Sequence, residues 1–390
     1  METYLDNAAT TKVFDSVVDI MNKVLSQDYG NPSSLHIKGL DGERYIRNTR
    51  EILAKALKVR EKEITFTSSG TEANNLGIIG AAYANKRAGN HIITSNIEHP
   101  SVDNVVNFLE EQGFEISRVP VDKYGRILIE ELKKQVNENT ILVSIMYVNN
   151  EIGSINDIPL IAKTIKEKNS NVLLHVDGVQ AFGKYKVYPK RLGIDLLSIS
   201  GHKIHGPKGV GALYIRDRVK VSPLMLGGGQ EEGMRSGTEN VPAIAGFGQA
   251  VKDIYENHQE KLKYLYKIKK EFVEGIIDLN NNISGIIING IEDDIRKSAP
   301  HIVSVSFKGV RAEVLLHALE DKNIYVSSGS ACSSNKPDIS STLKSIGVDK
   351  ELLNSTIRFS FSFQTKVDEI QHTLEELKKI VPILRRYQPR

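Results

Sequence analysis

The sequence predicts an α/β fold that combines a large, mostly parallel sheet with a smaller α/β domain. In the first half of the 390-residue chain, short apolar runs alternate with helical stretches, as they do in parallel sheets covered by helices. Near the C-terminus, two segments instead alternate apolar and polar residues, which is typical of half-buried antiparallel strands. A chain of this length exceeds one ordinary core, so two domains, or one large domain with an appendage, are expected.

The strands of the large sheet are short, β-branched runs that end at polar or glycine-containing stretches. They are expected at residues 64–69, 91–96, 141–148, 172–176, 196–200 and 212–216. Helices follow the first three strands and end near Asn85, Gln112 and Lys168. Because the carboxyl ends of parallel strands meet at one edge, the residues that follow these strands are expected to lie together.

A long charged helix follows, with apolar residues recurring at helical spacing between Val251 and Ile277, and it is expected to end at Asn280–Asn282. Its apolar positions are Leu262, Leu265, Ile268, Phe272 and Ile276. Strands at 301–307 and 356–362 and helices at 312–321 and 368–385 complete the smaller unit. We therefore predict a large domain over residues 15–255 and a small domain over residues 1–14 and 256–390.

Composition excludes several classes of protein. Hydrophobic residues at 40% and charged residues at 25% are near the globular average, and a net charge of +3 without a long basic block does not imply a nucleic-acid partner. The N-terminus METYLDNAAT lacks the pattern of a signal peptide, and no apolar run approaches the length of about 18 residues that a membrane helix needs. A soluble, cytoplasmic protein is expected. With one cysteine, the chain cannot form an internal disulfide.

Asp177 and Lys203 follow two neighbouring strands of the predicted sheet and are expected at the same edge. An acid and a lysine in this arrangement suit pyridoxal 5′-phosphate. This cofactor needs a lysine to hold it as a Schiff base and a carboxylate to keep its pyridine nitrogen protonated. The large domain is therefore expected to bind the cofactor. Taken singly, Asp177 could simply cap a helix, and Lys203 could be a solvated loop lysine.

Other polar residues are expected at the same edge. Ser68–Thr71 lies between a strand and a helix, where it could receive a phosphate or only cap the helix. His99 could stack on a cofactor ring and move protons, or be structural. Asn149–Asn150 and Gln180 could face the pocket, or belong to a turn and a helix start. No HExxH or paired Cys/His spacing supports a metal site.

Cys332 narrows the range of reactions that the protein could catalyse. It lies in SSGSACSSNKPDIS, a stretch of small polar residues without apolar periodicity, which indicates a loop rather than core. A buried, inert cysteine is the usual alternative. An exposed thiol becomes a nucleophile when its pKa is lowered or a base is nearby.

Ten stretches in order resemble the signatures of the cysteine desulfurases, in the housekeeping and nitrogen-fixation branch of the class V aminotransferase group. They are YLDNAATT (4–11), GNPSSLH (30–36), SSGTEANN (68–75), EHP (98–100), NNEIG (149–153), HVDGVQ (175–180), SGHKIHGPKG (200–209), MRSGTEN (234–240), SSGSACSS (327–334) and IRFS (357–360). Any one of them is weak, but ten in sequence are highly specific.

The resemblance implies the pyridoxal-phosphate fold type I, a homodimer, and conversion of L-cysteine to L-alanine. Sulfur would remain as a persulfide on Cys332 and pass to an acceptor such as an iron-sulfur scaffold protein. The sulfur would be used for iron-sulfur cluster assembly or for other thiolated products such as tRNA. No metal, membrane or direct nucleic-acid partner is implied for the isolated enzyme.

The resemblance also implies roles for particular residues. Lys203 would be the Schiff-base lysine and remove the α-proton, and Asp177 would pair with the pyridine nitrogen. His99 would stack on the ring and assist proton transfer. Gln180 and Asn150 would contact the region of the ring hydroxyl, with Asn150 also near the substrate.

The phosphate and the substrate have their own implied residues. Thr71, with Gly70, would hold the phosphate together with Ser200 and His202, and Thr238 would add a contact from the neighbouring subunit. Arg358 would bind the substrate carboxylate through its two-pronged guanidinium. Its strand agrees, because Ile357, Phe359 and Phe361 form an apolar face and leave Arg358 on the other.

Two positions depart from the pattern of the family. Glu232 stands where arginine is usual, and His205 stands where a tyrosine is common after the lysine. Two other functions stay open at this point. One is a different class V lyase or aminotransferase, or a preference for selenocysteine. The other is a docking protein whose catalysis is vestigial.

Overall fold

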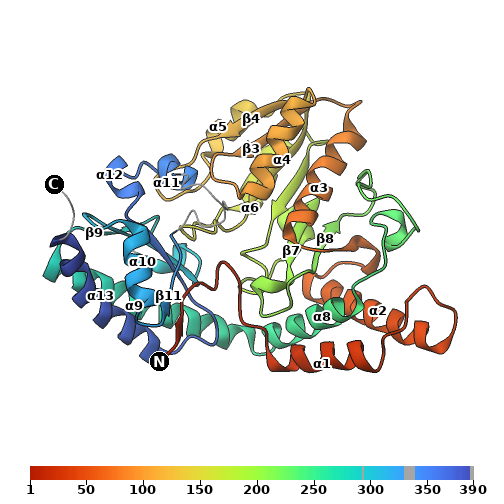
Figure 1. Cartoon of the computed structure of the whole chain (residues 1–390). Helices are drawn as coiled ribbons and strands as arrows, with labels where there is room; N and C mark the ends of the chain where they lie inside the picture. The colour runs from red at the N-terminus through yellow and green to blue at the C-terminus, as the bar shows by residue number, and fades with distance from the viewer. Residues whose placement is uncertain (292–293, 329–338, 387–390) are drawn as a thin grey trace.

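The computed structural model describes residues 1–291, 294–328 and 339–386. Within them, the largest sheet has seven strands in the order β2-β8-β7-β6-β5-β3-β4 (Figure 1). These strands are β2 (Ile64–Thr67), β3 (His91–Ser95), β4 (Glu115–Val119), β5 (Thr140–Met146), β6 (Leu173–Asp177), β7 (Leu196–Ser200) and β8 (Gly211–Ile215). Strand β8 is antiparallel to both β2 and β7, and the other neighbouring strands of this sheet are parallel, so the prediction of a mostly parallel sheet is confirmed.

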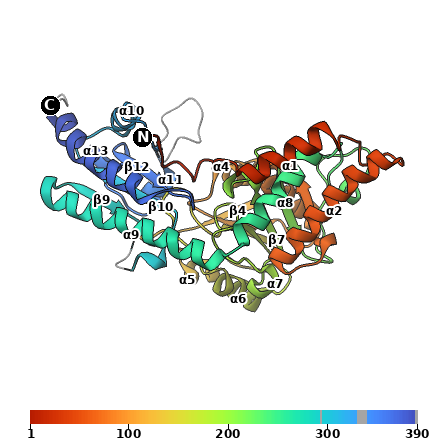
Figure 2. The same ribbon diagram turned by 90° about the horizontal axis from the view of Figure 1, so that it is seen from below.

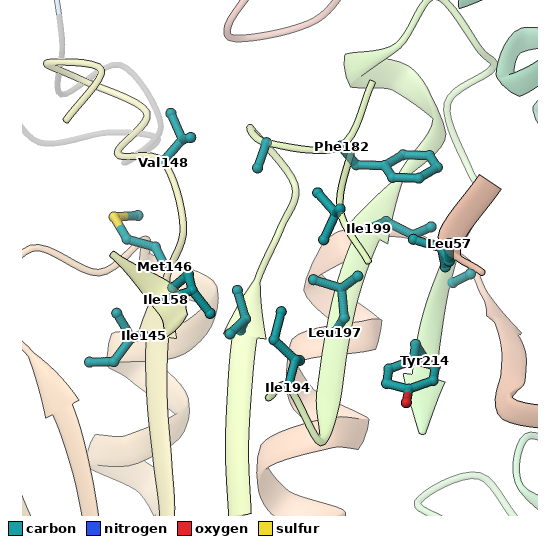
Figure 3. Packing of buried hydrophobic residues seen from close by; sticks show 14 of the residues in the cluster. Leu57, Ile145, Met146, Val148, Ile158, Phe182, Ile194, Leu197, Ile199 and Tyr214 are labelled. Atoms are coloured by element: carbon teal, nitrogen blue, oxygen red, sulfur yellow. The ribbon is translucent and has the colours of Figure 1, made fainter. Parts of the chain in front are cut away.

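Helices cover both faces of this sheet because its strands are apolar on both sides. Leu142 and Leu173 pack in a core with α3 (Gly70–Asn85) and α4 (Pro100–Glu111). Their neighbours Val143 and Leu174 point the other way and join a core with α6 (Ile158–Lys168) and α8 (Val241–Tyr255). Figure 3 shows part of this second core, with Ile158 beside Met146 and with Leu197 and Ile199 on β7.

A smaller sheet of the described residues has the order β12-β10-β9 and is antiparallel throughout. Its strands are β9 (Ile286–Asn289), β10 (Ile302–Phe307) and β12 (Thr356–Ser360). Helices α9 (His258–Ile283), α10 (Ala312–Glu320) and α13 (Val367–Arg386) pack with it around a separate core. The predicted antiparallel pair near the C-terminus is therefore confirmed, but the expectation that the two strands are half-buried is wrong, because both β10 and β12 are buried over their whole length.

The N-terminus adds a third, two-stranded sheet. Strand β1 (Thr3–Tyr4) pairs in parallel with β11 (Ile324–Tyr325), and Leu5 is buried in the core of the smaller sheet. The chain then crosses to α1 (Asp15–Ser26) and α2 (Ile37–Leu57), which pack against α8 (Figures 1 and 2). The boundaries of the two domains, at residues 14/15 and 255/256, stay a prediction.

The long helix expected from Val251 onward is two helices, so that prediction is wrong. Helix α8 ends at Tyr255, and α9 begins at His258. Between them, Asn257 has a φ of 49°, a left-handed conformation that interrupts the helix and that asparagine tolerates better than most residues. The end of α9 at Ile283 is close to the predicted one, and Leu265, Ile268, Phe272 and Ile276 are buried as expected.

Several elements were not predicted. Strand β4 lies at the edge of the large sheet and is exposed or half-buried over most of its length, so it lacks an apolar run. Helices α1 and α2, and the part of α8 before Val251, were not predicted either. The other unpredicted helices are short: α5 (Ile129–Gln135), α7 (Pro189–Leu192), α11 (Ser341–Ser345) and α12 (Lys350–Leu353). Over the residues described, no helix combines the length and the apolar character that a membrane crossing requires.

Lys269 is a fully buried lysine on α9, where the two sheet units meet. Its Nζ donates to Ser298 Oγ and to the Ala299 carbonyl, each at 2.6 Å, and Ala299 N in turn donates to the Gly153 carbonyl at 2.7 Å. Two acceptors match the two N–H bonds of a neutral amine. Burial lowers the pKa of Lys269 to about 7.

We predict that Lys269 makes the free energy of unfolding depend on pH. Between about pH 7 and pH 10 the unfolded chain binds a proton that the folded chain does not, so stability rises with pH by up to about 1.4 kcal/mol per pH unit. Lys269→Met removes this contribution. Urea unfolding of the native protein and the variant across this range measures the difference between the two.

The exposed neighbour Lys270 serves as the matched control. Lys270→Met is expected to leave the pH profile of the unfolding free energy as it is in the native protein. A constant difference between Lys269→Met and the native protein from pH 6 to pH 10 would contradict the assignment of a neutral amine.

Candidate active site

A cavity of about 310 Å³ lies at the carboxyl edge of the large sheet. It is reached by the ends of β5, β6 and β7, which is where open α/β sheets bind ligands. Most of the residues predicted for the site line it, namely Gly70, Thr71, His99, Asn150, Asp177, Gln180, Ser200, His202, Lys203 and Arg358. Thr238 is exposed and does not line it, and Cys332 lies outside the described residues.

Asp177 is the last residue of β6 and is buried. Its Oδ2 accepts a hydrogen bond from Asn74 Nδ2 at 2.8 Å, and its Oδ1 accepts one from Val179 N at 2.9 Å. Asn74 lies on α3, and its Nδ2 also donates to Ser101 Oγ. The Asp177 side chain is therefore held in one orientation by two neighbouring elements.

Lys203 ends the short 3₁₀ helix Gly201–Lys203 that follows β7. Its Nζ donates to the carbonyls of Ala8 and Ala9, at 2.7 and 2.6 Å, so the N-terminal segment meets the lysine directly. A second buried lysine, Lys184, donates from its Nζ to the Lys203 carbonyl at 2.5 Å. Burial, and next the charge of Lys203, lower the pKa of Lys184 to about 7.

His99 caps the N-terminus of α4, and its Nδ1 accepts a hydrogen bond from Ser101 N at 3.1 Å. Burial lowers the pKa of the His99 imidazole, while the nearby carboxylate of Asp177 acts in the opposite direction. Because burial is the larger effect, the ring favours its neutral form. A neutral imidazole can stack on a flat ligand and exchange a proton with it.

The opposite end of the cavity is suited to an anion. Ser69 caps α3 by accepting from Glu72 N at 3.1 Å, and the helix begins at Gly70. The Ser200 hydroxyl is buried, and no partner for its Oγ is found in the described parts of the chain. At Gly70, an added Cβ would lie 2.7 Å from Val179 Cγ2, so only glycine leaves the backbone this close.

Arg358 brings the smaller sheet to the cavity. It is buried on β12, where Ile357 and Phe359 face the core, so the predicted alternation is confirmed. Its guanidinium donates at 2.8 Å to the Asn150 carbonyl and at 2.8 Å to Asp6 Oδ1. Its Nε has no hydrogen-bond partner among the residues described, so part of the fork is available to an incoming group.

Three residues of the site were not singled out from the sequence as contributors. Asn74 supports Asp177, Asp6 pairs with Arg358, and the Ala8 carbonyl receives Lys203. Asn74 follows Gly70 by four residues, so helical spacing could have placed both on one side of α3. No local signal places Asp6 or Ala8, because their partners are more than 190 residues away in sequence.

The two departures from the family pattern lie outside the cavity lining. His205 is buried, has a φ of 62°, stacks on Phe14 at 4.3 Å and donates from its Nδ1 to the Lys12 carbonyl at 2.7 Å. It therefore supports the segment that precedes α1. Glu232 is exposed, whereas the side chain of the adjacent Glu231 is 3% exposed and pairs with Arg50 at 2.7 Å.

Comparisons with known proteins show the family to which the chain belongs. The family model described as aminotransferase class-V matches residues 3–373. A cysteine desulfurase IscS of Clostridium botulinum is 41% identical over 388 residues, which cover 100% of this chain and 96% of the relative. A mitosomal cysteine desulfurase of Trachipleistophora hominis is 43% identical over 392 residues, with 99% and 87% coverage.

Solved structures are similar over nearly the whole chain. A NifS-like protein superposes with a TM-score of 0.91 at 38% identity, covering 98% of this chain and 100% of that one. A structure described as SspA in complex with cysteine gives a TM-score of 0.77 at 32% identity, with 92% and 99% coverage. The fold, the cavity at its sheet edge and these matches together identify the chain as a member of the class-V aminotransferase family.

Proposed function

We propose that this protein is a pyridoxal-phosphate-dependent cysteine desulfurase that converts L-cysteine to L-alanine and transfers the sulfur to Cys332. The observation that carries the proposal is the meeting of Asp177, Lys203, His99 and Arg358 around one cavity. The first three suit a pyridoxal ring, and the fourth suits a substrate carboxylate. The relatives named as cysteine desulfurases support the same reaction.

The cavity fits the cofactor that the class-V family uses. The unpartnered Ser200 hydroxyl and the close backbone approach at Gly70, at the start of α3, suit a phosphate. Thr71 and His202 would complete the phosphate end of the cavity. Burial, and next the charge of Lys203, lower the pKa of His202 to about 3, so its ring is neutral. Asp177 would keep the pyridine nitrogen protonated. When bound, pyridoxal phosphate supplies an electron sink for charge that develops at the substrate α-carbon.

The side chains of the cavity then have separate tasks. Lys203 would hold the cofactor and, once displaced by the substrate amine, move the α-proton. His99, as a neutral ring, would stack and assist proton transfer. Arg358 would orient L-cysteine by its carboxylate, because its Nε is still available and the Asn150 carbonyl and Asp6 fix its plane.

Cys332 would accept the sulfur atom of the substrate. As the C–S bond of L-cysteine breaks, a bond forms between its sulfur and the Cys332 sulfur, and a proton is delivered to the carbon. The products are L-alanine and one persulfide, so atoms and electrons balance without a further oxidant. An acceptor protein, such as an iron-sulfur scaffold, would then take the sulfur.

Exposed apolar residues support a homodimer. Leu35 is 98% exposed, Leu226 is 82% exposed and Tyr29 is 71% exposed. Tyr29 and Leu35 lie in one segment, and Leu226 lies in another. The two segments are close in space, because Pro32 of the first and Glu232, just after the second, line the same polar cavity. A second copy of the chain would cover them and bring Thr238 to the neighbouring site.

The first test uses the single thiol of the chain. Incubation with L-cysteine without reductant is expected to add one sulfur atom to the peptide that holds Cys332, as read by mass spectrometry. With reductant present, alanine and sulfide are expected in equal amounts. Cys332→Ser is expected to abolish both the added sulfur and the sulfide, because no other cysteine can replace it.

The matched control is Ser333→Ala, a change beside Cys332 that leaves the thiol in place. It is expected to retain the added sulfur. If Cys332→Ser releases sulfide at the native rate, the proposed route through a persulfide on this residue is wrong.

A second test concerns the substrate carboxylate. Arg358→Lys keeps a positive charge but loses the two-pronged donor, so KM for L-cysteine is expected to rise by about 10- to 100-fold with a smaller change in kcat. Steady-state kinetics measures both constants. The exposed Arg311→Lys is the control. An unchanged KM in folded Arg358→Lys would remove Arg358 from the substrate site.

A further inference from the structure

A buried histidine from the smaller sheet holds a side chain of the cavity in place. Gln180 lines the cavity and is 5% exposed. Its Nε2 donates to the Ala8 carbonyl at 2.9 Å, and its Oε1 lies 3.1 Å from Nε2 of His301. His301 stands just before β10, is 1% exposed and does not itself line the cavity.

These contacts assign the proton on the His301 ring. The Ala8 carbonyl can only accept a hydrogen bond, so the amide nitrogen of Gln180 must face it and the amide oxygen must face His301. An amide oxygen also only accepts, so Nε2 of His301 must carry the hydrogen. The orientation of one amide therefore fixes the tautomer of the histidine.

The surroundings of His301 keep its ring neutral. Burial is the main cause that holds its pKa well below the usual range, and the nearby basic groups of Lys184, Lys269, Arg358 and Lys203 act in the same direction to the extent that each is protonated. A neutral ring with its hydrogen on Nε2 has a bare Nδ1. This atom is buried, and no partner for it is found over the residues described.

We propose that His301 is a positioning residue, whose hydrogen bond to Oε1 fixes the Gln180 amide so that an N–H is presented to a deprotonated oxygen of the bound ligand. A glutamine amide has two N–H donors, and the Ala8 carbonyl takes one of them. The other serves the ring hydroxyl oxygen of the cofactor in its anionic form. This inference rests on the proposed function.

His301 and the Ala8 carbonyl both favour the same orientation of the Gln180 amide. If the amide turned over, its oxygen would face the Ala8 carbonyl, which already accepts from Lys203 Nζ at 2.7 Å. The same turn would direct the amide N–H toward the donor of His301 and the amide oxygen toward the anionic ligand. His301 therefore acts on the ligand through Gln180, without touching it.

The test is the pH titration of the visible absorption of protein loaded with pyridoxal phosphate. Four proteins are compared with the native one: His301→Leu, His301→Gln, Gln180→Leu and the double variant His301→Leu/Gln180→Leu. In His301→Leu the midpoint is expected to rise by about one pH unit, because the anionic oxygen loses a donor. In His301→Gln, whose side-chain N–H can replace the ring Nε2–H, most of this shift is expected to disappear.

The double variant shows whether His301 acts through Gln180. Gln180→Leu alone is expected to raise the midpoint, and adding His301→Leu to it is expected to change the midpoint no further. The inference is overturned if folded His301→Leu titrates like the native protein. It is also overturned if His301→Gln shifts as far as His301→Leu, or if His301→Leu shifts the Gln180→Leu protein by its full amount.

Failure of the proposed function gives a different result. If the native protein shows no visible band after loading with pyridoxal phosphate, the cofactor assignment fails before any substitution is made, and the inference falls with it. A native band with unaffected His301 variants overturns the positioning role alone.

A second measurement reads the His301 tautomer in the native protein and uses a variant only to assign the signal. Long-range proton–nitrogen NMR of cofactor-free protein with ring-labelled histidine is expected to show His301 with a proton on Nε2 and a bare Nδ1 from pH 6 to pH 8. Loss of this signal in His301→Gln assigns it. A proton on Nδ1 of His301 would overturn the inference, because Nε2 would then have no hydrogen to donate.

Discussion

The parallel register of β5, β6 and β7 is the constraint on which the site depends. Met146 stands opposite Asp177, and Asp177 stands opposite Ser198, so these strands end nearly level and their following loops leave at one edge. An apolar strand can be buried on both faces, but the polar residues at its end need partners. Asp177 finds them in Asn74 and Val179 N. The geometry of the sheet thus creates both the cavity and the need for its hydrogen bonds.

The smaller sheet also contributes residues to the site at the edge of the large sheet. Arg358 and His301 reach the edge of the large sheet from β12 and from the residue before β10, and each contacts a residue of a loop that follows β5 or β6. The N-terminal segment is shared between the two, since Ala8 N donates to Ser360 Oγ at 2.8 Å while the Ala8 carbonyl receives Lys203. Arg358 and Lys203 line the same cavity, which favours anionic ligands such as a phosphate and an amino-acid carboxylate.

Local patterns were sufficient for the parts of the fold and site that depend on nearest neighbours. Apolar runs that stop at Asp177 and Ser200 predicted the strands and their shared edge, and alternation around Arg358 predicted its inward face. Local patterns failed where a distant contact decides the outcome. The left-handed turn at Asn257 interrupts a continuous helical pattern, and His301 meets Gln180 across 121 positions of sequence. The roles of the site residues came from the resemblance to a family, since spacing alone left ordinary alternatives for each.

The central claim is that the cavity at the sheet edge holds pyridoxal phosphate on Lys203. Loading the protein with the cofactor, reducing it with borohydride and mapping the modified peptide by mass spectrometry tests this most directly. The account predicts one pyridoxyl group per chain, on Lys203. Stable labelling of another lysine, such as the neighbouring buried Lys184, or no labelling at all, would contradict it.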